Sequence, residues 1–183
     1  MFNRLFAIII LVVFCPLFLF VSCAILIEDG YPFFFKQKRV GINYSFFNIY
    51  KFRSMKKNTP NLATHLLVNP DQYLLKIGKF IRKSSLDELP NLINIIKGEM
   101  VFVGPRPALY NQEDLMAQRV ATGVYKLKPG ITGWAQINGR DELSIEKKIL
   151  LDQEYLNKKS LLFDFKIIIK TFTNVLFSNG VHH

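Results

Sequence analysis

Cysteine and histidine are scarce in this 183-residue chain. The only cysteines, Cys15 and Cys23, both lie in an apolar N-terminal run, where they form neither a disulfide framework nor a metal site. We expect them to pack as small apolar residues. The three histidines, His65, His182 and His183, form no ligand cluster in the sequence. The sequence therefore predicts no metal site built from cysteine and histidine.

Acidic residues are absent from the stretch between Gly30 and Pro70. The basic residues of this stretch are Lys36, Lys38, Arg39, Lys51, Arg53, Lys56 and Lys57. The whole chain has a net charge of +10, yet 50% of its residues are hydrophobic and 17 are phenylalanine. A basic and apolar chain suits a membrane surface or an anionic lipid-linked substrate better than nucleic acid, since its aromatic residues are not interleaved as a stacking platform. The length fits one domain.

Charged residues are also absent from the N-terminal run Leu5 to Ile27. At about 1.5 Å per residue, a helix over this run would extend roughly 35 Å, enough for a bilayer core of about 30 Å. A cleaved signal peptide is disfavoured because the apolar run continues past Cys23. Pro16 lies in the middle of the run and breaks helical hydrogen bonding. The residues alone leave a kinked spanning helix and a re-entrant hairpin equally open.

The basic stretch has the composition of two strands. Phe33–Phe35 and Phe46–Phe52 are rich in aromatic residues and are joined by a turn at Gly41–Asn43, so we expect a β-hairpin. Its basic side chains would either dock on anionic headgroups or hold the phosphates of an anionic substrate. The polar segment Asn58 to Asn69 is expected to be a loop.

Two adjacent carboxylates, Asp87 and Glu88, precede an apolar run at helical spacing that ends at Gly98. With Ser85 or Asp87 as the cap, the carboxylates would lie at a helix N-terminus, where free amides and the dipole favour anions. One interpretation is a capping box formed by Ser85 and Glu88. The other is a magnesium site or a carboxylate that attacks phosphorus.

Two further stretches are candidates for anion binding. Arg106 stands between two prolines that fix its backbone and prepare the guanidinium for bidentate phosphate binding, although a surface turn is the simpler explanation. Lys128 to Arg140 holds three glycines and the only tryptophan, which predicts a tight loop and not a packed element. Its glycines would let amides approach an anion, Trp134 would offer a stacking face and Arg140 a charge. It matches neither a Walker loop nor a dinucleotide fingerprint.

Three segments complete the predicted elements: an amphipathic one over Tyr73 to Lys83, a helical and charged one over Ser144 to Asn157, and one with an apolar stripe over Leu161 to Phe177. A short buried strand is expected over Met100 to Val103. In the last helix an apolar stripe recurs at helical spacing, and it predicts either core packing or contact with a bilayer interface. The residues of this stripe are Leu162, Phe165, Ile169, Phe172 and Leu176.

Six ordered blocks of sequence resemble the bacterial sugar transferase family, the small monotopic polyprenyl-phosphate phosphoglycosyl transferases. The blocks are Phe14-Cys15-Pro16, Phe35-Lys36-Gln37-x-Arg39-Val40-Gly41, Tyr50-Lys51-Phe52-Arg53-Ser54-Met55, Ser85-Leu86-Asp87-Glu88-Leu89-Pro90, Phe102-Val103-Gly104-Pro105-Arg106-Pro107 and Lys128-Pro129-Gly130-Ile131-Thr132-Gly133-Trp134-Ala135-Gln136. The resemblance runs from about Phe2 to Gly180 and is to the minimal catalytic form.

The resemblance implies a reaction: a sugar 1-phosphate passes from a UDP-sugar to a polyprenyl phosphate such as undecaprenyl phosphate, with release of UMP and a requirement for Mg²⁺. Asp87 matches the nucleophile that forms a covalent phosphosugar intermediate, and Glu88 matches the second acid. Both are candidate metal ligands. Candidate phosphate or nucleotide contacts are Arg106, Arg140, Lys51 and Arg53.

The resemblance also implies an α+β fold with an N-terminal re-entrant membrane hairpin, a small β-hairpin, amphipathic helices at the membrane interface and Gly/Pro-rich active-site loops. Residues 1–28 would be embedded in the bacterial inner membrane, and residues 29–183 would form a catalytic domain on the cytoplasmic face. The family breaks its hairpin at Ser-Pro, which is Cys15-Pro16 here, and Cys is a weaker partner for the freed carbonyls. An acidic residue that usually follows Arg4 is replaced by Ala7.

The implied partners are a UDP-sugar, a polyprenyl phosphate and membrane lipids, with no nucleic acid. A homodimer and contacts with downstream glycosyltransferases are compatible with the resemblance. The competing hypothesis is a non-catalytic basic protein of the membrane surface, in which the dyad is only a helix cap and the arginines bind headgroups. It gives no reason for the glycine-rich loop with its tryptophan, and release of UMP from a UDP-sugar would distinguish the two.

Overall fold

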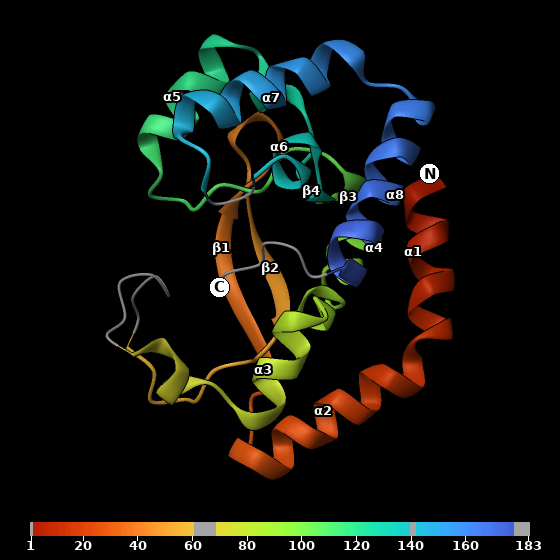
Figure 1. Ribbon diagram of the computed structural model, residues 1–183, viewed down its shortest axis with the longest axis vertical. Coiled ribbons are helices and arrows are strands. Elements are labelled where there is room, and N and C mark those ends of the chain that lie inside the picture. The colour runs from red at the N-terminus through yellow and green to blue at the C-terminus, as the bar shows by residue number, and fades with distance from the viewer. Residues whose placement is uncertain (1, 61–68, 140–141, 178–183) are drawn as a thin grey trace.

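The computed structural model describes residues 2–60, 69–139 and 142–177 and has mixed helices and strands, as expected for an α+β fold (Figure 1). The helices are α1 (Phe2–Val13), α2 (Cys15–Asp29), α3 (Lys76–Lys83), α4 (Asn91–Lys97), α5 (Glu113–Ala121), α6 (Trp134–Ile137), α7 (Ile145–Lys158) and α8 (Leu161–Phe177). The strands are β1 (Phe34–Val40), β2 (Phe46–Phe52), β3 (Val101–Val103) and β4 (Gly130–Thr132). Short 3₁₀ turns cover Ile42–Tyr44, Pro70–Tyr73, Leu86–Glu88 and Val124–Lys126.

Helices α1 and α2 form a bent arm along one side and the lower edge of the molecule (Figure 1). Their axes differ by 64°, and the bend falls at Phe14, directly before Cys15 and Pro16. Pro16 is the second residue of α2, where its missing N–H costs least. No single helix in the described part of the chain is long and apolar enough to cross a membrane, and only this bent pair meets that test, by length and composition.

Each arm of the bent pair buries one narrow face. Ala7 of α1 is fully buried in a core cluster with Leu92 and Ile95 of α4. Val21 and Ile25 of α2 are buried in a second cluster with residues of β2 and α3. Other apolar side chains of both helices remain exposed: Phe2, Leu5, Phe6, Ile8, Ile9, Val12, Val13, Leu19, Phe20, Leu26 and Ile27.

The predicted β-hairpin is confirmed. Strands β1 and β2 pair antiparallel from Phe34↔Phe52 to Val40↔Phe46, and the hairpin stands at the centre of the fold (Figure 1). Phe47 and Ile49 point into the α1–α4 cluster, while Phe52 reaches the α2–α3 cluster. Because side chains alternate between faces, Lys51 lies on the same face as Phe47 and Ile49, near the start of α4.

The glycine-rich segment is not the free loop that the sequence predicts. Gly130 to Thr132 forms β4, which pairs parallel with β3, and α6 follows directly. The amide of Gly104 donates to Thr132 O and that of Gly130 to Pro105 O, both at 2.9 Å. A Cβ at Gly104, Gly130 or Gly133 would collide with backbone of the other segment. These glycines therefore let two chain segments approach each other, and the two amides are not available to an anion.

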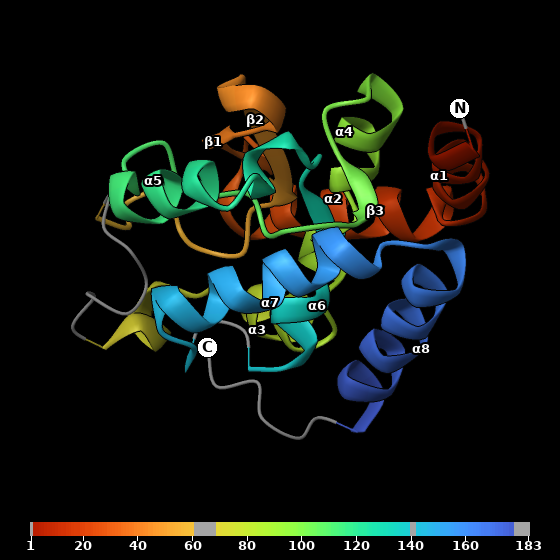
Figure 2. The same cartoon turned by 90° about the horizontal axis from the view of Figure 1, so that it is seen from above.

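Trp134 packs against the C-terminal helices and does not offer a free stacking face. Its ring lies 5.0 Å from that of Phe163, and its Nε1 donates to Glu154 at 2.8 Å. Helix α7 begins as predicted, with Ser144 as its cap accepting from the amide of Lys147. Helix α8 leaves apolar side chains exposed: Leu161, Leu162, Phe165, Ile169 and Phe172. The prediction that this stripe packs in the core is therefore wrong for its members Leu162, Phe165, Ile169 and Phe172. Helices α1 and α8 lie at the same end of the molecule (Figure 2).

Candidate active site

The carboxylate dyad lies in a 3₁₀ turn ahead of α4 and not in the first turn of that helix. Ser85 adopts a left-handed conformation at φ 56°, and its side chain makes no capping hydrogen bond. Helix α4 begins at Asn91 with Pro90 as its cap residue, and it ends at Gly98 as expected. The capping-box interpretation is therefore wrong. The left-handed conformation of Ser85 separates α3 from the 3₁₀ turn that carries both carboxylates.

Lys51 of β2 forms ion pairs with both carboxylates of the dyad. Its Nζ lies 2.6 Å from Oε1 of Glu88 and 3.9 Å from Oδ2 of Asp87. The three side chains are 14–19% exposed, so this cluster is largely desolvated but reachable from solvent. One ammonium thus lies near both carboxylates, an arrangement that a helix cap does not require.

Burial raises the pKa of Asp87 from 3.8 to about 6, and the charge of Glu88 adds to the effect. Lys51, Arg82 and the amide of Asp87 itself act in the opposite direction. Desolvation thus outweighs the favourable partners of this carboxylate. At pH 7 a group with a pKa near 6 is still mostly ionised, so most molecules carry a charged Asp87 at neutral pH.

Arg82 is a site residue that the sequence analysis missed. It lies on α3, interacts electrostatically with Asp87, and donates from Nε to Ser54 Oγ at 2.8 Å. Burial lowers the pKa of its guanidinium, and Asp87 raises it. Its position on the polar face of the helix that leads into the dyad was the available signal.

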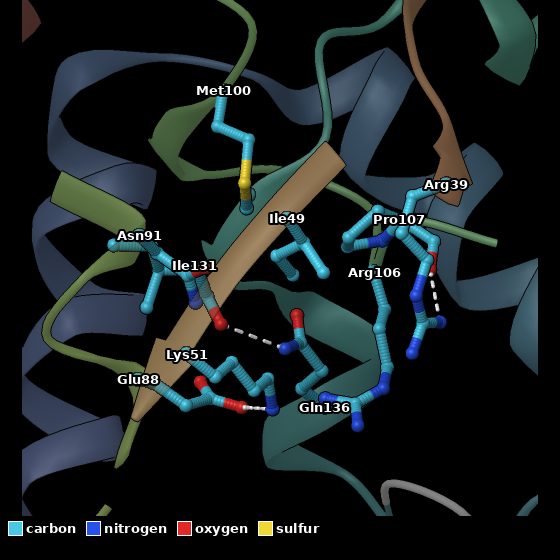
Figure 3. Close-up of a pocket in the computed structure, with 11 residues that line it drawn as sticks. Arg39, Ile49, Lys51, Glu88, Asn91, Met100, Arg106, Pro107, Ile131 and Gln136 are labelled. Carbon is cyan, nitrogen blue, oxygen red and sulfur yellow. Dashed lines mark hydrogen bonds and ion pairs between the residues drawn. The ribbon is translucent and has the colours of Figure 1, made fainter. Parts of the chain in front are cut away.

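A small open pocket adjoins the dyad (Figure 3). It brings together three of the predicted residues, Lys51, Glu88 and Arg106. Arg106 is half-buried in the loop after β3, and Figure 3 shows its side chain running alongside Gln136 of α6. Arg39 supports this loop, because its Nη1 donates to Pro107 O at 2.9 Å. Further lining residues are Arg39, Ile49, Asn91, Met100, Pro107, Gly130, Ile131 and Gln136.

One predicted contact, Arg53, is not part of this group. Arg53 is 7% exposed, pairs with Asp29 at 2.8 Å and donates to Gly30 O at 2.6 Å, so it fastens the end of α2 and does not line the pocket. Arg140 lies outside the described residues.

The dyad has the donor chemistry for Mg²⁺. Among the described residues no group of three or more His, Cys, Asp or Glu side chains could hold a metal ion. Mg²⁺ does not need such a cage, because it is usually bound by one or two carboxylates together with substrate phosphates. That Lys51 contacts Glu88 and approaches Asp87 shows that a cation is accepted beside both carboxylates.

Comparison with known proteins places the chain in a family. The family model described as bacterial sugar transferase matches residues 1–178. The chain is 41% identical to the uncharacterized sugar transferase EpsL of Bacillus subtilis, over 99% of this chain and 88% of that protein. It is 36% identical to the exopolysaccharide production protein ExoY of Rhizobium meliloti, over 98% and 85%.

A third relative carries a more specific name. The UDP-glucose:undecaprenyl-phosphate glucose-1-phosphate transferase of Escherichia coli is 37% identical over 90% of this chain, which spans 38% of that longer protein. The matches cover nearly every described element, from α1 to α8, and include the dyad and its pocket. The chain belongs to the bacterial sugar transferase family.

Proposed function

We propose that this protein transfers a sugar 1-phosphate from a UDP-sugar to a polyprenyl phosphate such as undecaprenyl phosphate, releasing UMP, as the first membrane step of glycoconjugate assembly. The observation that carries the proposal is the partly buried dyad of Asp87 and Glu88 with Lys51 beside it and Arg106 in the adjoining pocket. The names of relatives, undecaprenyl-phosphate glucose and galactose phosphotransferases, support it.

Asp87 is the proposed nucleophile. An oxygen of its carboxylate attacks the phosphorus that carries the sugar, and a new P–O bond forms. The bond from that phosphorus to the oxygen that bridges the two phosphates breaks. UMP leaves with the electrons of that bond. The phosphate oxygen of the polyprenyl phosphate then attacks the same phosphorus and releases the Asp87 carboxylate. The raised pKa of Asp87 suits this role, since desolvation makes the carboxylate more reactive while most of it stays ionised.

The cations around the dyad offset the repulsion between a carboxylate and a phosphate. Lys51 and Arg82 lie close enough to Asp87 to influence its charge. The planar guanidinium of Arg106 suits two phosphate oxygens at once. Asp87 and Glu88 would hold Mg²⁺, which would neutralise phosphate charge when bound.

We further propose that residues 1–28 form a re-entrant hairpin in the bacterial inner membrane and that residues 29–183 lie on the cytoplasmic face. The bend at Phe14 and the exposed apolar side chains on α1 and α2 support this arrangement. The exposed stripe of α8 suits the membrane interface, because a helix with one apolar face lies in the plane of the headgroups.

The first test is release of UMP when the purified protein is mixed with a UDP-sugar, undecaprenyl phosphate and Mg²⁺. No release over a panel of UDP-sugars would overturn the proposal and favour the non-catalytic membrane-surface protein. Without lipid acceptor, a UDP-sugar labelled in the sugar is expected to leave label and a phosphate mass on the wild-type protein.

The dyad variants separate chemistry from structure. Asp87→Asn is expected to stay unlabelled and to lose several orders of magnitude in turnover, because a neutral amide is a poor nucleophile. Glu88→Gln is expected to lose less, since the nucleophile remains. A folded Asp87→Asn protein that turns over at a comparable rate would show that Asp87 is not the nucleophile.

A further inference from the structure

Two carboxamide oxygens of residues that line the pocket beside the dyad are buried and accept no hydrogen bond from the residues that the structure describes. They are Oδ1 of Asn91, a residue that is 1% exposed, and Oε1 of Gln136, a residue that is 9% exposed. Both residues line the pocket together with Glu88 (Figure 3). Buried acceptors in folded proteins are almost always paired, and no donor for these two atoms comes from residues 2–60, 69–139 or 142–177.

The orientation of Gln136 is fixed by the backbone. Its Nε2 donates to the carbonyl oxygen of Ile131 in β4 at 2.9 Å, which turns Oε1 away from that strand. Oε1 lies against Gly133, where a Cβ would come within 2.8 Å of it, so only a glycine at this position leaves room for the oxygen. The amide cannot rotate without losing the Ile131 bond, so the group of Gln136 that remains unpaired is an acceptor.

Asn91 closely follows the dyad turn in the chain. It is the first residue of α4, three residues after Glu88, and it lines the same pocket. Neither oxygen suits the phosphates of a substrate, because phosphate oxygens are acceptors as well. The hydroxyl groups of a sugar are donors, and they meet this requirement.

The proposed chemistry places the sugar nearby. The phosphorus that Asp87 attacks is one oxygen away from the sugar ring, whereas the uracil base is separated from it by a second phosphate and the ribose. Resting on the proposed function, we infer that Asn91 and Gln136 accept hydrogen bonds from hydroxyl groups of the donor sugar and so determine which sugar is transferred. Sites built to pair a substrate hydroxyl reject analogues without it strongly, because buried protein atoms are then left unpaired.

The test compares sugars in two variants that keep side-chain size but remove the acceptor, Asn91→Leu and Gln136→Met. The probes are UDP-glucose, UDP-galactose and UDP-N-acetylglucosamine, each with undecaprenyl phosphate and Mg²⁺, and kcat/KM is measured from UMP release. The ratio of kcat/KM between the preferred and the next sugar is expected to fall at least tenfold in each variant. The KM for undecaprenyl phosphate and the inhibition by UMP should stay within twofold of wild type.

Thr132→Val is the matched control, because it removes another buried polar contact of β4, the 2.7 Å bond to Thr171, outside the pocket. Its sugar ratio should equal that of the wild type. If Gln136→Met fails to fold in a thermal melt, Asn91→Leu decides the question alone.

Each other outcome contradicts the inference. An unchanged ratio in folded, active variants would mean that the two oxygens bind only water. Weaker inhibition by UMP together with an unchanged ratio would mean that they pair with uracil. A wild-type protein that releases UMP from no UDP-sugar would instead overturn the proposed function itself, and the inference with it.

Discussion

The side chain of Asp87 lies in an environment that favours its uncharged form. Its carboxyl is 14% exposed, and burial raises its pKa to about 6 despite Lys51 and Arg82. In the unfolded chain the same group titrates at its usual value, so the folded protein holds a proton there between about pH 4 and 6 that the unfolded chain has released. Stability from this group is therefore lost as the pH rises through that window.

Asp87→Asn is thus expected to stabilise the fold at neutral pH while it abolishes turnover. A pKa that is raised from 3.8 to about 6 lowers the free energy of unfolding at pH 7.5 by at most about 3 kcal/mol. We expect the variant to melt several degrees higher than wild type at pH 7.5 in detergent with EDTA, and the gain to disappear near pH 4. Asp114→Asn, at an exposed position on α5, should show little difference at either pH. A lower melting temperature for Asp87→Asn at pH 7.5 would contradict the argument.

Arg106 stands between two prolines that restrict its backbone, and Arg39 holds the carbonyl of Pro107 at 2.9 Å. Arg106→Lys keeps the charge but replaces a planar fork by a single ammonium. We expect kcat/KM for the UDP-sugar to fall at least tenfold, with an unchanged melting temperature. Wild-type kinetics in this variant would mean that the guanidinium has only a structural role.

At the scale of elements, the sequence predicted what depends on local pattern. The β-hairpin, the start of α7 at Ser144 and the end of α4 at Gly98 were all predicted correctly, because alternation, caps and glycine act over a few residues. The turn that carries the dyad was not predicted correctly, because a serine in the left-handed conformation, such as Ser85, has no strong sequence signal.

Long-range contacts explain the other errors. Gly130–Thr132 becomes a strand only because β3 lies beside it, and Trp134 is covered by helices that follow it in the chain. Only part of the pocket could be predicted from the sequence. Its charged residues Lys51, Glu88 and Arg106 belong to the blocks that resemble the family. The neutral Asn91 and Gln136 are candidates only because their buried oxygens accept no hydrogen bond from the described residues. Nothing in a single sequence reports an unpaired atom.

The β3–β4 contact supports the Arg106 loop on one side and α6 on the other. Gly130→Ala would push a methyl group into the backbone at Gly104. We therefore expect kcat to fall at least tenfold, because the strand ends that carry Arg106 and Gln136 must separate. Gly123→Ala is the comparison, because a Cβ at Gly123 would fit, with Leu156 as its nearest neighbour at 3.8 Å. The strain there comes only from the backbone, which has a φ of 78°. It should cost about 1 kcal/mol of stability and leave kcat unchanged. Equal kcat values in the two variants would refute this role for the glycine contact.

For the whole molecule, exposed apolar surface is concentrated on α1, α2 and α8, while the dyad lies where β2 meets the turn before α4. Large exposed apolar surfaces mark sites of membrane or protein contact. A re-entrant hairpin would set the depth of the protein in one leaflet.

The hairpin requires both chain ends on one side of the membrane. Tags at the N-terminus and after residue 183 should both be modified by a reagent confined to the cytoplasmic face. An N-terminal tag that is protected there and labelled from outside would overturn the re-entrant arrangement.

We expect Pro16 to enforce this arrangement. It lacks an amide hydrogen and clashes with the preceding turn, next to the 64° bend at Phe14. In Pro16→Leu the helix can continue from α1 into α2, and the joined segment is long enough for a bilayer core of about 30 Å. A measurable fraction of molecules should then expose the N-terminal tag outside. Phe14→Leu is the matched control, since it alters the bend residue but keeps the proline, and its N-terminus should stay on the cytoplasmic face. If Pro16→Leu also keeps every N-terminus there, the packing of Ala7 against α4, and not the proline, holds the hairpin in place.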